Sequence, residues 1–183
     1  MKRIKCRSCD GHYKIRGGKF GDFAGCSNYP QCKSTLKIHD FVFEYIKAYG
    51  INVYAWEKAC WKCGKNTKVY SYYLNYDLAE ADDYFEHLGN IGLGDIGSVD
   101  KYLSDKYSTI NVRFSKTVNG SYMANTCEYC RALQGRNYVV EDPHEIMNDL
   151  MFDHDMDKYW VENIPCEKAG VTWNEIKSLF LME

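Results

Sequence analysis

Residues 6–32 hold four cysteines in two pairs, Cys6-Arg-Ser-Cys9 and Cys26-Ser-Asn-Tyr-Pro-Gln-Cys32. Sixteen residues separate the pairs, enough to run out and back as a hairpin. A pair two residues apart fits a tight turn that points both sulfur atoms at one ion, and Zn²⁺ accepts a closed tetrahedral set of thiolates. The spacing therefore predicts a zinc site formed by Cys6, Cys9, Cys26 and Cys32.

The residues around these cysteines have the pattern of a small β-ribbon. Residues 12–16 alternate as in a strand, Gly17-Gly18 is a turn signal, and residues 19–24 are expected to form the returning strand. Residues 35–38 are expected to form a third strand. So few apolar residues cannot form a core, and we expect the metal to take its place.

The charge of the chain is unevenly distributed. Residues 1–39 carry nine Lys or Arg and two Asp, a net charge of +7, whereas residues 40–183 have a net charge of −9. Cations follow phosphates and bases stack on aromatic rings, so this basic, aromatic segment is expected to bind nucleic acid. The predicted contacts are Lys14, Arg16, Lys19, Phe20, Phe23, Tyr29 and Lys33. In the alternative interpretation the lysines serve solubility, and Phe23 and Tyr29 pack over the zinc knuckle.

Residues 6–32 also resemble the four-cysteine zinc finger repeated at the C-terminus of bacterial type IA topoisomerases. The shared features are the cysteine pairs, Arg16-Gly17, Gly21-x-Phe23 and Cys26-Ser-x-Tyr-Pro-x-Cys32. Arg7 and Asp10 depart from the usual Pro and Gly, but neither change removes a ligand. In that family the finger binds DNA, preferentially single-stranded, so the resemblance implies this ligand for the ribbon. We do not expect topoisomerase activity, since 183 residues cannot hold the strand-cleaving domains.

Two further Cys-x₂-Cys motifs lie far apart, at Cys60-Trp-Lys-Cys63 and Cys127-Glu-Tyr-Cys130. Strand-like segments flank both motifs, as in ribbon-type four-cysteine sites. Their separation exceeds the usual ~15–20 residues, so pairing requires a long insertion over about residues 64–126. We predict a second zinc ion on Cys60, Cys63, Cys127 and Cys130; the alternative is two half-sites completed in a dimer. The motifs resemble a bacterial family of four-cysteine zinc domains with no assigned activity, which supports the pairing.

The remaining segments predict an α+β protein. We expect a short linking helix over residues 41–49, capped by Asp40, and helices over residues 78–88 and 98–107. Strands are expected over residues 51–57, 66–75, 110–118, 121–125 and 135–140. Capping patterns at residues 142–145 and 172–175 predict helices that cover the sheet of the second zinc site. The predicted domains are a zinc ribbon, residues 1–39, and a larger zinc-stapled antiparallel sheet domain with several helices, residues 40–183.

The sequence shows no convincing catalytic motif. Gly92-Leu-Gly94-Asp-Ile-Gly97 has the spacing of a dinucleotide-binding loop, but it follows a predicted helix instead of a strand, so we expect a plain loop. Cys166 is expected to be a buried thiol. We therefore do not expect an enzyme. A nuclease or DNA-repair accessory enzyme with a site in the second domain, and a protein-interaction adaptor, are the alternatives.

Composition points to a soluble protein of the cytoplasm. Of the 183 residues, 45% are hydrophobic and 26% charged, and no apolar run approaches the ~18 residues of a membrane span. The first residues lack the apolar segment of a secretion signal. Thiols stay reduced in the cytoplasm, so nine cysteines indicate metal binding instead of disulfides.

Overall fold

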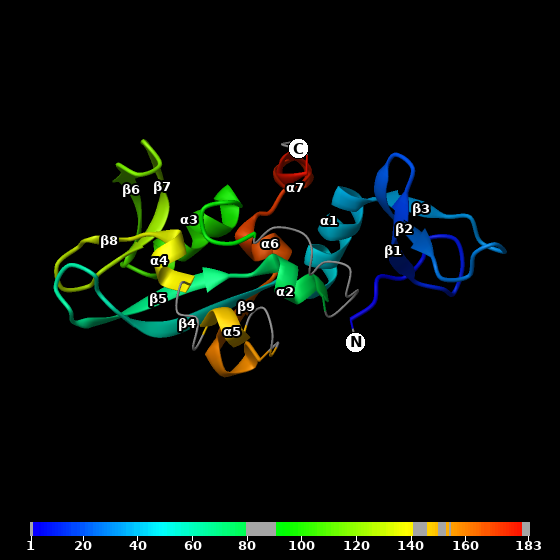
Figure 1. Cartoon of the computed structure of the whole chain (residues 1–183). Helices are drawn as coiled ribbons and strands as arrows, with labels where there is room; N and C mark the ends of the chain where they lie inside the picture. Colours follow the sequence, from blue (N-terminus) through cyan, green and yellow to red (C-terminus); the bar gives the residue numbers. More distant parts are fainter. Residues whose placement is uncertain (1, 80–90, 141–145, 150–152, 154, 181–183) are drawn as a thin grey trace. The chain divides into compact units, whose positions relative to one another are not determined.

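The computed structural model describes residues 2–79, 91–140, 146–149, 153 and 155–180 (Figure 1). The chain divides into two compact units. The first comprises residues 1–51, 74–90 and 164–183, and the second comprises residues 52–73 and 91–163. Helices and three small sheets confirm the α+β class. Separate folding of residues 1–39 and 40–183 stays a prediction.

The ribbon of the first unit is a three-stranded antiparallel sheet. Strands β1 (Tyr13–Gly18), β2 (Gly21–Cys26) and β3 (Thr35–Lys37) pair in that order. The register runs from Tyr13 opposite Cys26 to Gly18 opposite Gly21. Because side chains alternate along a strand, one face of the sheet is buried and the other is exposed.

Helix α1 (Ile38–Tyr49) contributes Phe41, Val42, Tyr45 and Ile46 to the core of the first unit. It ends at Tyr49, as expected, and Gly50 follows with φ 68°, a conformation that glycine adopts readily. The predicted cap at Asp40 is wrong: the helix begins at Ile38 without a side-chain cap. The helix packs against β2, β3, α6 (Cys166–Ala169) and α7 (Trp173–Leu179). It is thus a core element and not the linker that we predicted.

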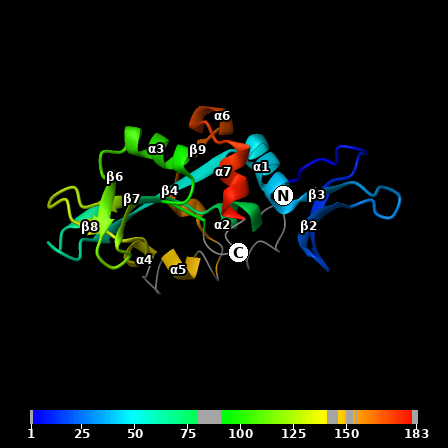
Figure 2. The same cartoon turned by 90° about the horizontal axis from the view of Figure 1, so that it is seen from above.

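Helix α7 (Trp173–Leu179) begins with the predicted capping box between Thr172 and Glu175. Within the first unit it packs against α1, as both Figure 1 and Figure 2 show, whereas the prediction placed it on the sheet of the second zinc site. The indole Nε1 of Trp173 donates to Oδ1 of Asp40 over 2.7 Å, which ties the two helices together.

The second unit contains two three-stranded sheets. One has the order β5 (Asn66–Tyr72), β4 (Ile51–Ala59), β9 (Trp160–Ile164). The other has the order β6 (Ile110–Ser115), β7 (Gly120–Thr126), β8 (Leu133–Gln134). The amide of Asn125 on β7 joins them, because its Nδ2 donates to the Tyr70 carbonyl over 2.8 Å and its Oδ1 accepts from the Tyr70 N–H over 2.9 Å.

The helices of the chain differ in part from those expected. Helix α3 (Gly97–Lys106) lies where residues 98–107 predicted it. Helix α2 (Leu74–Ala79) begins before residue 78, and the rest of that prediction lies outside the described residues. Residues 135–140 form no strand: β8 ends at Gln134 and α4 (Arg136–Val140) follows. The capping pattern at residues 142–145 is outside the described residues, before α5 (Ile146–Asn148) and the 3₁₀ turn η3 (Asp157–Tyr159).

No helix within the described residues combines the length and apolar character needed to cross a lipid bilayer.

Candidate metal centres and nucleic-acid interface

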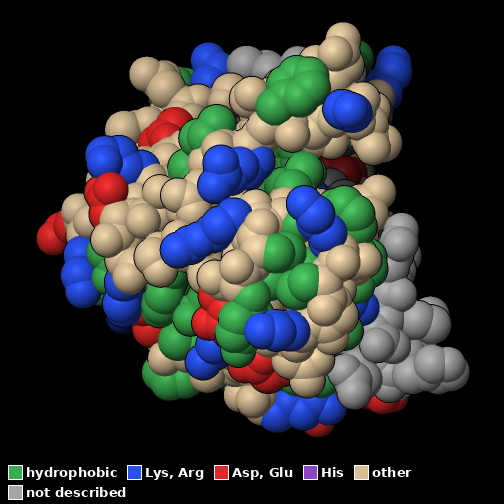
Figure 3. Space-filling view, turned by 90° about the vertical axis from the view of Figure 1, so that its left-hand side faces the viewer, with side chains coloured by type: hydrophobic (Ala, Val, Ile, Leu, Met, Phe, Trp, Pro, Cys, Tyr) green, Lys and Arg blue, Asp and Glu red, His purple; other side chains and the backbone are tan. Residues whose placement is uncertain are grey.

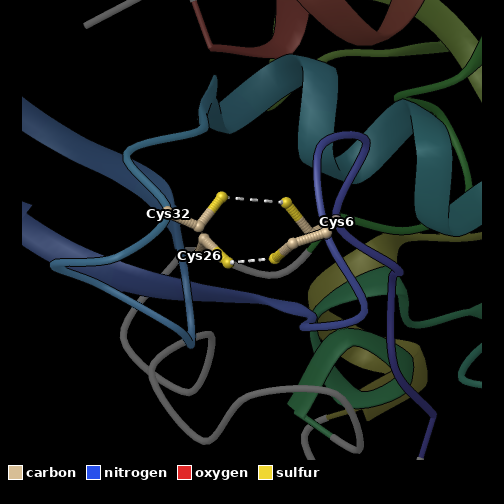
Figure 4. A group of neighbouring side chains, drawn as sticks. Cys6, Cys26 and Cys32 are labelled. Carbon is tan, nitrogen blue, oxygen red and sulfur yellow. Dashed lines mark hydrogen bonds between the residues drawn. The ribbon is translucent and has the colours of Figure 1, made fainter.

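The four cysteines of the ribbon converge on one point. Their sulfur atoms lie within 4.8 Å of one another, with 3.7 Å between Sγ of Cys6 and Cys32 and 3.4 Å between Sγ of Cys9 and Cys26. Figure 4 shows the sulfur atoms of Cys6, Cys26 and Cys32 pointing toward one another. A tetrahedral site with Zn–S bonds of ~2.3 Å has edges of about 3.8 Å, whereas a disulfide needs ~2.05 Å. The spacing therefore fits a metal and excludes disulfides.

Amide groups around this cluster are placed to stabilise thiolates. The backbone N–H groups of Ser8, Gly11 and Asn28 donate to Sγ of Cys6, Cys9 and Cys26 over 3.4, 3.4 and 3.3 Å. Hydrogen bonds to the charged form of a ligand orient it and favour its ionisation. The knuckles thus provide both the sulfur ligands and the donors that compensate their charge.

The thiols of the ribbon differ in acidity. Burial raises the pKa of Cys26 to about 12, and the neighbouring thiols reinforce this effect. Burial also opposes ionisation of Cys6, but the Ser8 N–H and hydrogen bonds from neighbouring side chains outweigh it and lower the pKa of Cys6 to about 6. Since a metal binds thiolates, loading this site must displace protons from the less acidic thiols.

The second cluster joins the two distant knuckles within one chain. The sulfur atoms of Cys60, Cys63, Cys127 and Cys130 lie within 4.8 Å of one another. The Sγ–Sγ distances are 3.6 Å between Cys60 and Cys130 and 3.7 Å between Cys63 and Cys127. These distances again match tetrahedral edges. The predicted pairing is confirmed, and a dimer partner is not needed to complete the ligand set.

The two knuckles of this cluster share one backbone conformation. The N–H of Cys60 donates to the Lys65 carbonyl and that of Cys127 to the Ala132 carbonyl, both over 2.9 Å. In each knuckle the residue after the second cysteine has positive φ, 72° at Gly64 and 58° at Arg131. Gln134 adds a side-chain donor, because its Nε2 lies 3.3 Å from Sγ of Cys60. The sequence pattern did not identify this contact, which depends on the pairing of β7 with β8.

Each four-cysteine cluster can therefore hold one zinc ion. Both donor sets are all-sulfur, which suits a soft or borderline-soft ion. Four protein ligands leave no open coordination position, so both sites have the character of structural zinc sites.

The exposed face of the ribbon sheet gathers three of the predicted nucleic-acid contacts. Lys14 and Arg16 point outward from β1, and directly opposed residues share a face. Arg16 is opposite Phe23 on β2, and Phe23 is opposite Lys37 on β3. Lys14, Arg16, Phe23 and Lys37 thus form one surface, here called the ribbon face. The sequence analysis missed Lys37, because its orientation follows only from the β2–β3 register.

Phe23 is half-buried on this face by close packing across the strands. A Cβ atom on Gly25 would lie 3.0 Å from Cδ of Arg16 and 3.3 Å from Cε2 of Phe23. A Cβ atom on Gly18 would lie 3.1 Å from the Phe23 ring. The lack of side chains at Gly18 and Gly25 therefore leaves room for the Phe23 ring and, at Gly25, for the Arg16 stem. Phe23 is on the face opposite Ala24 and Cys26, so it does not pack over the zinc knuckle.

The other predicted contacts lie in turns. Phe20 at the β1–β2 turn is 96% exposed, with Lys19 Nζ 5.5 Å from its ring centre. Tyr29 is 66% exposed in the second knuckle, and Lys33 is exposed after Cys32. The ion pairs of the described residues do not involve Lys14, Lys19 or Lys33. These cations are available to an anionic partner.

The glycine-rich loop at residues 92–97 is closed by its own carboxylates. Gly92 N–H donates to Oδ2 of Asp95 over 2.7 Å, and Gly94 N–H lies 3.1 Å from both carboxylate oxygens of Asp100. Amide groups already bonded to carboxylates are not available to a pyrophosphate. The loop is a structural element of the second unit, as expected.

Comparison with known proteins identifies the first segment. No curated protein and no solved structure matches the chain. Residues 3–40 match the family described as topoisomerase DNA binding C4 zinc finger. The matched segment contains all four ribbon cysteines and the ribbon face, so the chain carries a zinc finger of the topoisomerase DNA-binding type at these residues.

Proposed function

We propose that this protein binds single-stranded DNA through its N-terminal zinc ribbon. The observation that carries the proposal is the ribbon face, which places Lys14, Arg16 and Lys37 around the ring of Phe23 within a segment that matches a DNA-binding finger. Cations spaced around an aromatic ring can bind phosphates while a base stacks on the ring.

The local electrostatics agree with an anionic ligand. His12, next to β1, has its pKa lowered chiefly by burial and further by the positive charges of Arg3 and Lys14. Only the smaller, electrostatic part of this shift reflects the positive charges of Arg3 and Lys14, and these charges also attract an anion. Exposed Phe20 and Tyr29 provide further rings on which unpaired bases can stack, which favours a single strand over a duplex.

The test is the salt dependence of oligo(dT) binding by the full chain, followed by fluorescence anisotropy. Lys14→Gln, Arg16→Gln and Lys19→Gln are combined in one variant. Each phosphate contact to a single strand adds about 0.7 to the slope of log K against log salt. The triple variant should lose about 2 from the slope and about a hundredfold in affinity at ~50 mM salt.

The control replaces three cations of equal charge that already have carboxylate partners, through Lys47→Gln, Lys101→Gln and Lys106→Gln. This variant should retain the wild-type slope. Competition by unlabelled duplex DNA and RNA tests the ligand class, and single-stranded DNA should compete best. An unchanged slope in the ribbon variant would exclude the ribbon face as the binding site.

A further inference from the structure

The second unit contains an open pocket of about 650 Å³ beside its zinc cluster. Its walls come from Trp61 in the first knuckle, the end of the β6–β7 hairpin, the loop at residues 93–95, and residues 133–138. This volume is typical of small-molecule sites, which span ~300–1,000 Å³.

Aromatic side chains line the pocket and are held in place by hydrogen bonds. Trp61 is 60% exposed, and its indole Nε1 donates to the Leu133 carbonyl over 2.6 Å. The hydroxyl of Tyr138 donates to the Ala59 carbonyl. Lys58 Nζ lies 5.1 Å from the centre of the Tyr138 ring. Rings that are fixed by such bonds before binding lose little freedom when a planar ligand stacks on them.

The segments that form the pocket walls and the adjoining knuckles are rich in positive charge, in contrast to the rest of the unit. Residues 57–68, 93–95, 113–122 and 128–138 carry eight of the eleven Lys and Arg of the second unit, and only three of its thirteen Asp and Glu. Figure 3 shows this face, where Lys and Arg side chains lie among hydrophobic ones and fewer Asp and Glu. The surface formed by these segments therefore suits a polyanion, although the second unit as a whole is acidic.

Several of these cations form no ion pair with an acidic group in the described part of the chain. Among the described residues no ion pair involves Lys62, Lys65 or Arg131, all of which are exposed. Lys65 Nζ instead lies 4.7 Å from the ring centre of Tyr129, which is 55% exposed. A second stacking surface thus lies on the same knuckles.

The pocket lacks the groups of a hydrolytic site. Of the described residues that line it, Asp95 alone carries a carboxylate, and this group is paired with Arg136 over 2.9 Å. A single neutralised carboxylate cannot serve as the acid–base pair or the metal ligand set of a nuclease. The pocket itself offers rings for stacking, and the exposed cations that can attract a phosphate lie on the adjoining knuckles.

We propose that this pocket is a second nucleic-acid site, where a base of a single strand stacks on Trp61 while Lys62, Lys65 and Arg131 bind its phosphates. The site shares no residue with the ribbon face. Failure of one proposal therefore leaves the other standing.

The experiment uses the full chain with Lys14, Arg16 and Lys19 replaced by Gln, so that the ribbon contributes little. The probe is labelled oligo(dT) of about eight nucleotides, within the usual size of one single-strand site. This protein should retain salt-dependent binding. Addition of Trp61→Ala should lower the remaining affinity about tenfold or more, the effect expected for one stacked base.

Trp160→Ala is the matched control, since Trp160 is 52% exposed in the same unit and its Nε1 likewise donates, to Asn52. It should leave oligo(dT) binding unchanged. Because Trp61 adjoins the zinc ligand Cys60, a second variant combines Lys62→Gln with Arg131→Gln, which removes exposed charge without altering the knuckle backbone. Retention of two zinc ions by each variant verifies folding.

The outcomes separate the two sites. If the ribbon-neutralised protein does not bind oligo(dT), or binds it equally well with Trp61→Ala and with Lys62→Gln/Arg131→Gln, the pocket is not a nucleic-acid site. If ribbon neutralisation has no effect and the pocket variants abolish binding, the pocket proposal stands and the ribbon proposal is overturned.

Discussion

Asp100 is a carboxylate enclosed in the second unit, with 4% of its surface exposed. It accepts hydrogen bonds from the Gly94 N–H and from the hydroxyl of Tyr72, each over 3.1 Å. Burial nevertheless dominates and raises the pKa of Asp100 from 3.8 to about 6. The folded state therefore holds a proton on this group at a pH where the unfolded chain has released it.

This shift gives a pH prediction. Between pH 4 and pH 6 the folded state binds more protons, so the stability contributed by Asp100 is greatest at the acidic end and is lost as the pH rises through 6. One pKa unit corresponds to about 1.4 kcal/mol. The stability of the wild type relative to Asp100→Asn should thus fall by up to about 3 kcal/mol from pH 4 to pH 6.5, measured by urea unfolding.

The comparison between variants removes the effect of thiol protonation at the zinc sites, which both proteins share. Asp105→Asn is the control, because Asp105 lies on the same helix, is exposed and pairs with Lys101. Its stability difference from the wild type should not change over this pH range. A pH-independent difference for Asp100→Asn would show that the carboxylate is ionised throughout.

At the scale of the element, the zinc knuckles depend on one left-handed residue. Gly64 and Arg131 hold equivalent positions with φ 72° and 58°. A Cβ atom on Gly64 would meet nothing within 4 Å, so the cost of a side chain there is one of backbone conformation alone. For a residue with a Cβ atom this conformation costs about 1–2 kcal/mol.

Adding a side chain at Gly64 and removing one at Arg131 should therefore have different effects on the free energy of unfolding. Gly64→Ala is expected to lower the free energy of unfolding by about 1–2 kcal/mol. Arg131→Gly relieves similar strain but increases the freedom of the unfolded chain, so the net change should stay within about 0.5 kcal/mol. Urea unfolding in excess zinc measures both. Equal losses would mean that Arg131 contributes contacts of its own.

Local sequence signals predicted where helices and strands begin and end better than they predicted which elements pack against one another. Thr172 and Glu175 predicted the start of α7 because a capping box involves only residues within four consecutive positions. The motif carries no information on the surface that the helix covers, and α7 packs on α1. Residues 136–140 include Tyr and two Val, which favour a strand. Tertiary contacts decide otherwise: the Trp56 indole donates to the Val139 carbonyl over 3.2 Å while these residues form a helix.

The candidate sites likewise divide into residues that a local sequence pattern predicted and residues whose position depends on tertiary structure. Cysteine spacing predicted both ligand sets because thiolates at such intervals have few other roles in a reduced chain. Lys37 and the wall of the pocket formed by Trp61 and Tyr138 were not predictable. Their positions follow from strand register and from the meeting of four separate segments.

At the scale of the whole molecule, metal content is the direct test of the two clusters. The wild type should hold two zinc ions per chain by elemental analysis. Cys6→Ser should leave one, and Cys60→Ser and Cys127→Ser, alone or together, should also leave one, because both ligate the same ion. Apparent binding energies of structural zinc, about 10–16 kcal/mol, rival the stability of a whole domain, so removal of zinc should unfold the ribbon in circular dichroism.

Cys166→Ser is the control. This thiol is buried in the first unit, where it donates to the Val171 carbonyl over 3.7 Å and burial raises its pKa. Its replacement should leave both ions bound. Zinc-dependent dimerisation, or loss of different ions from Cys60→Ser and Cys127→Ser, would contradict a second site formed within one chain.

The spacing of the two clusters also sets the order in which the protein can be built. The ribbon site closes a loop of 26 residues, between Cys6 and Cys32, whereas the second site closes one of 70, between Cys60 and Cys130. The difference in closure entropy is only about 1 kcal/mol, so the longer loop adds little to the cost of forming the second site. During synthesis, however, the ribbon can take up its ion as soon as its hairpin has emerged. The Cys60 knuckle must wait, with its thiols exposed to oxidation and to competing metals, until Cys130 has been made.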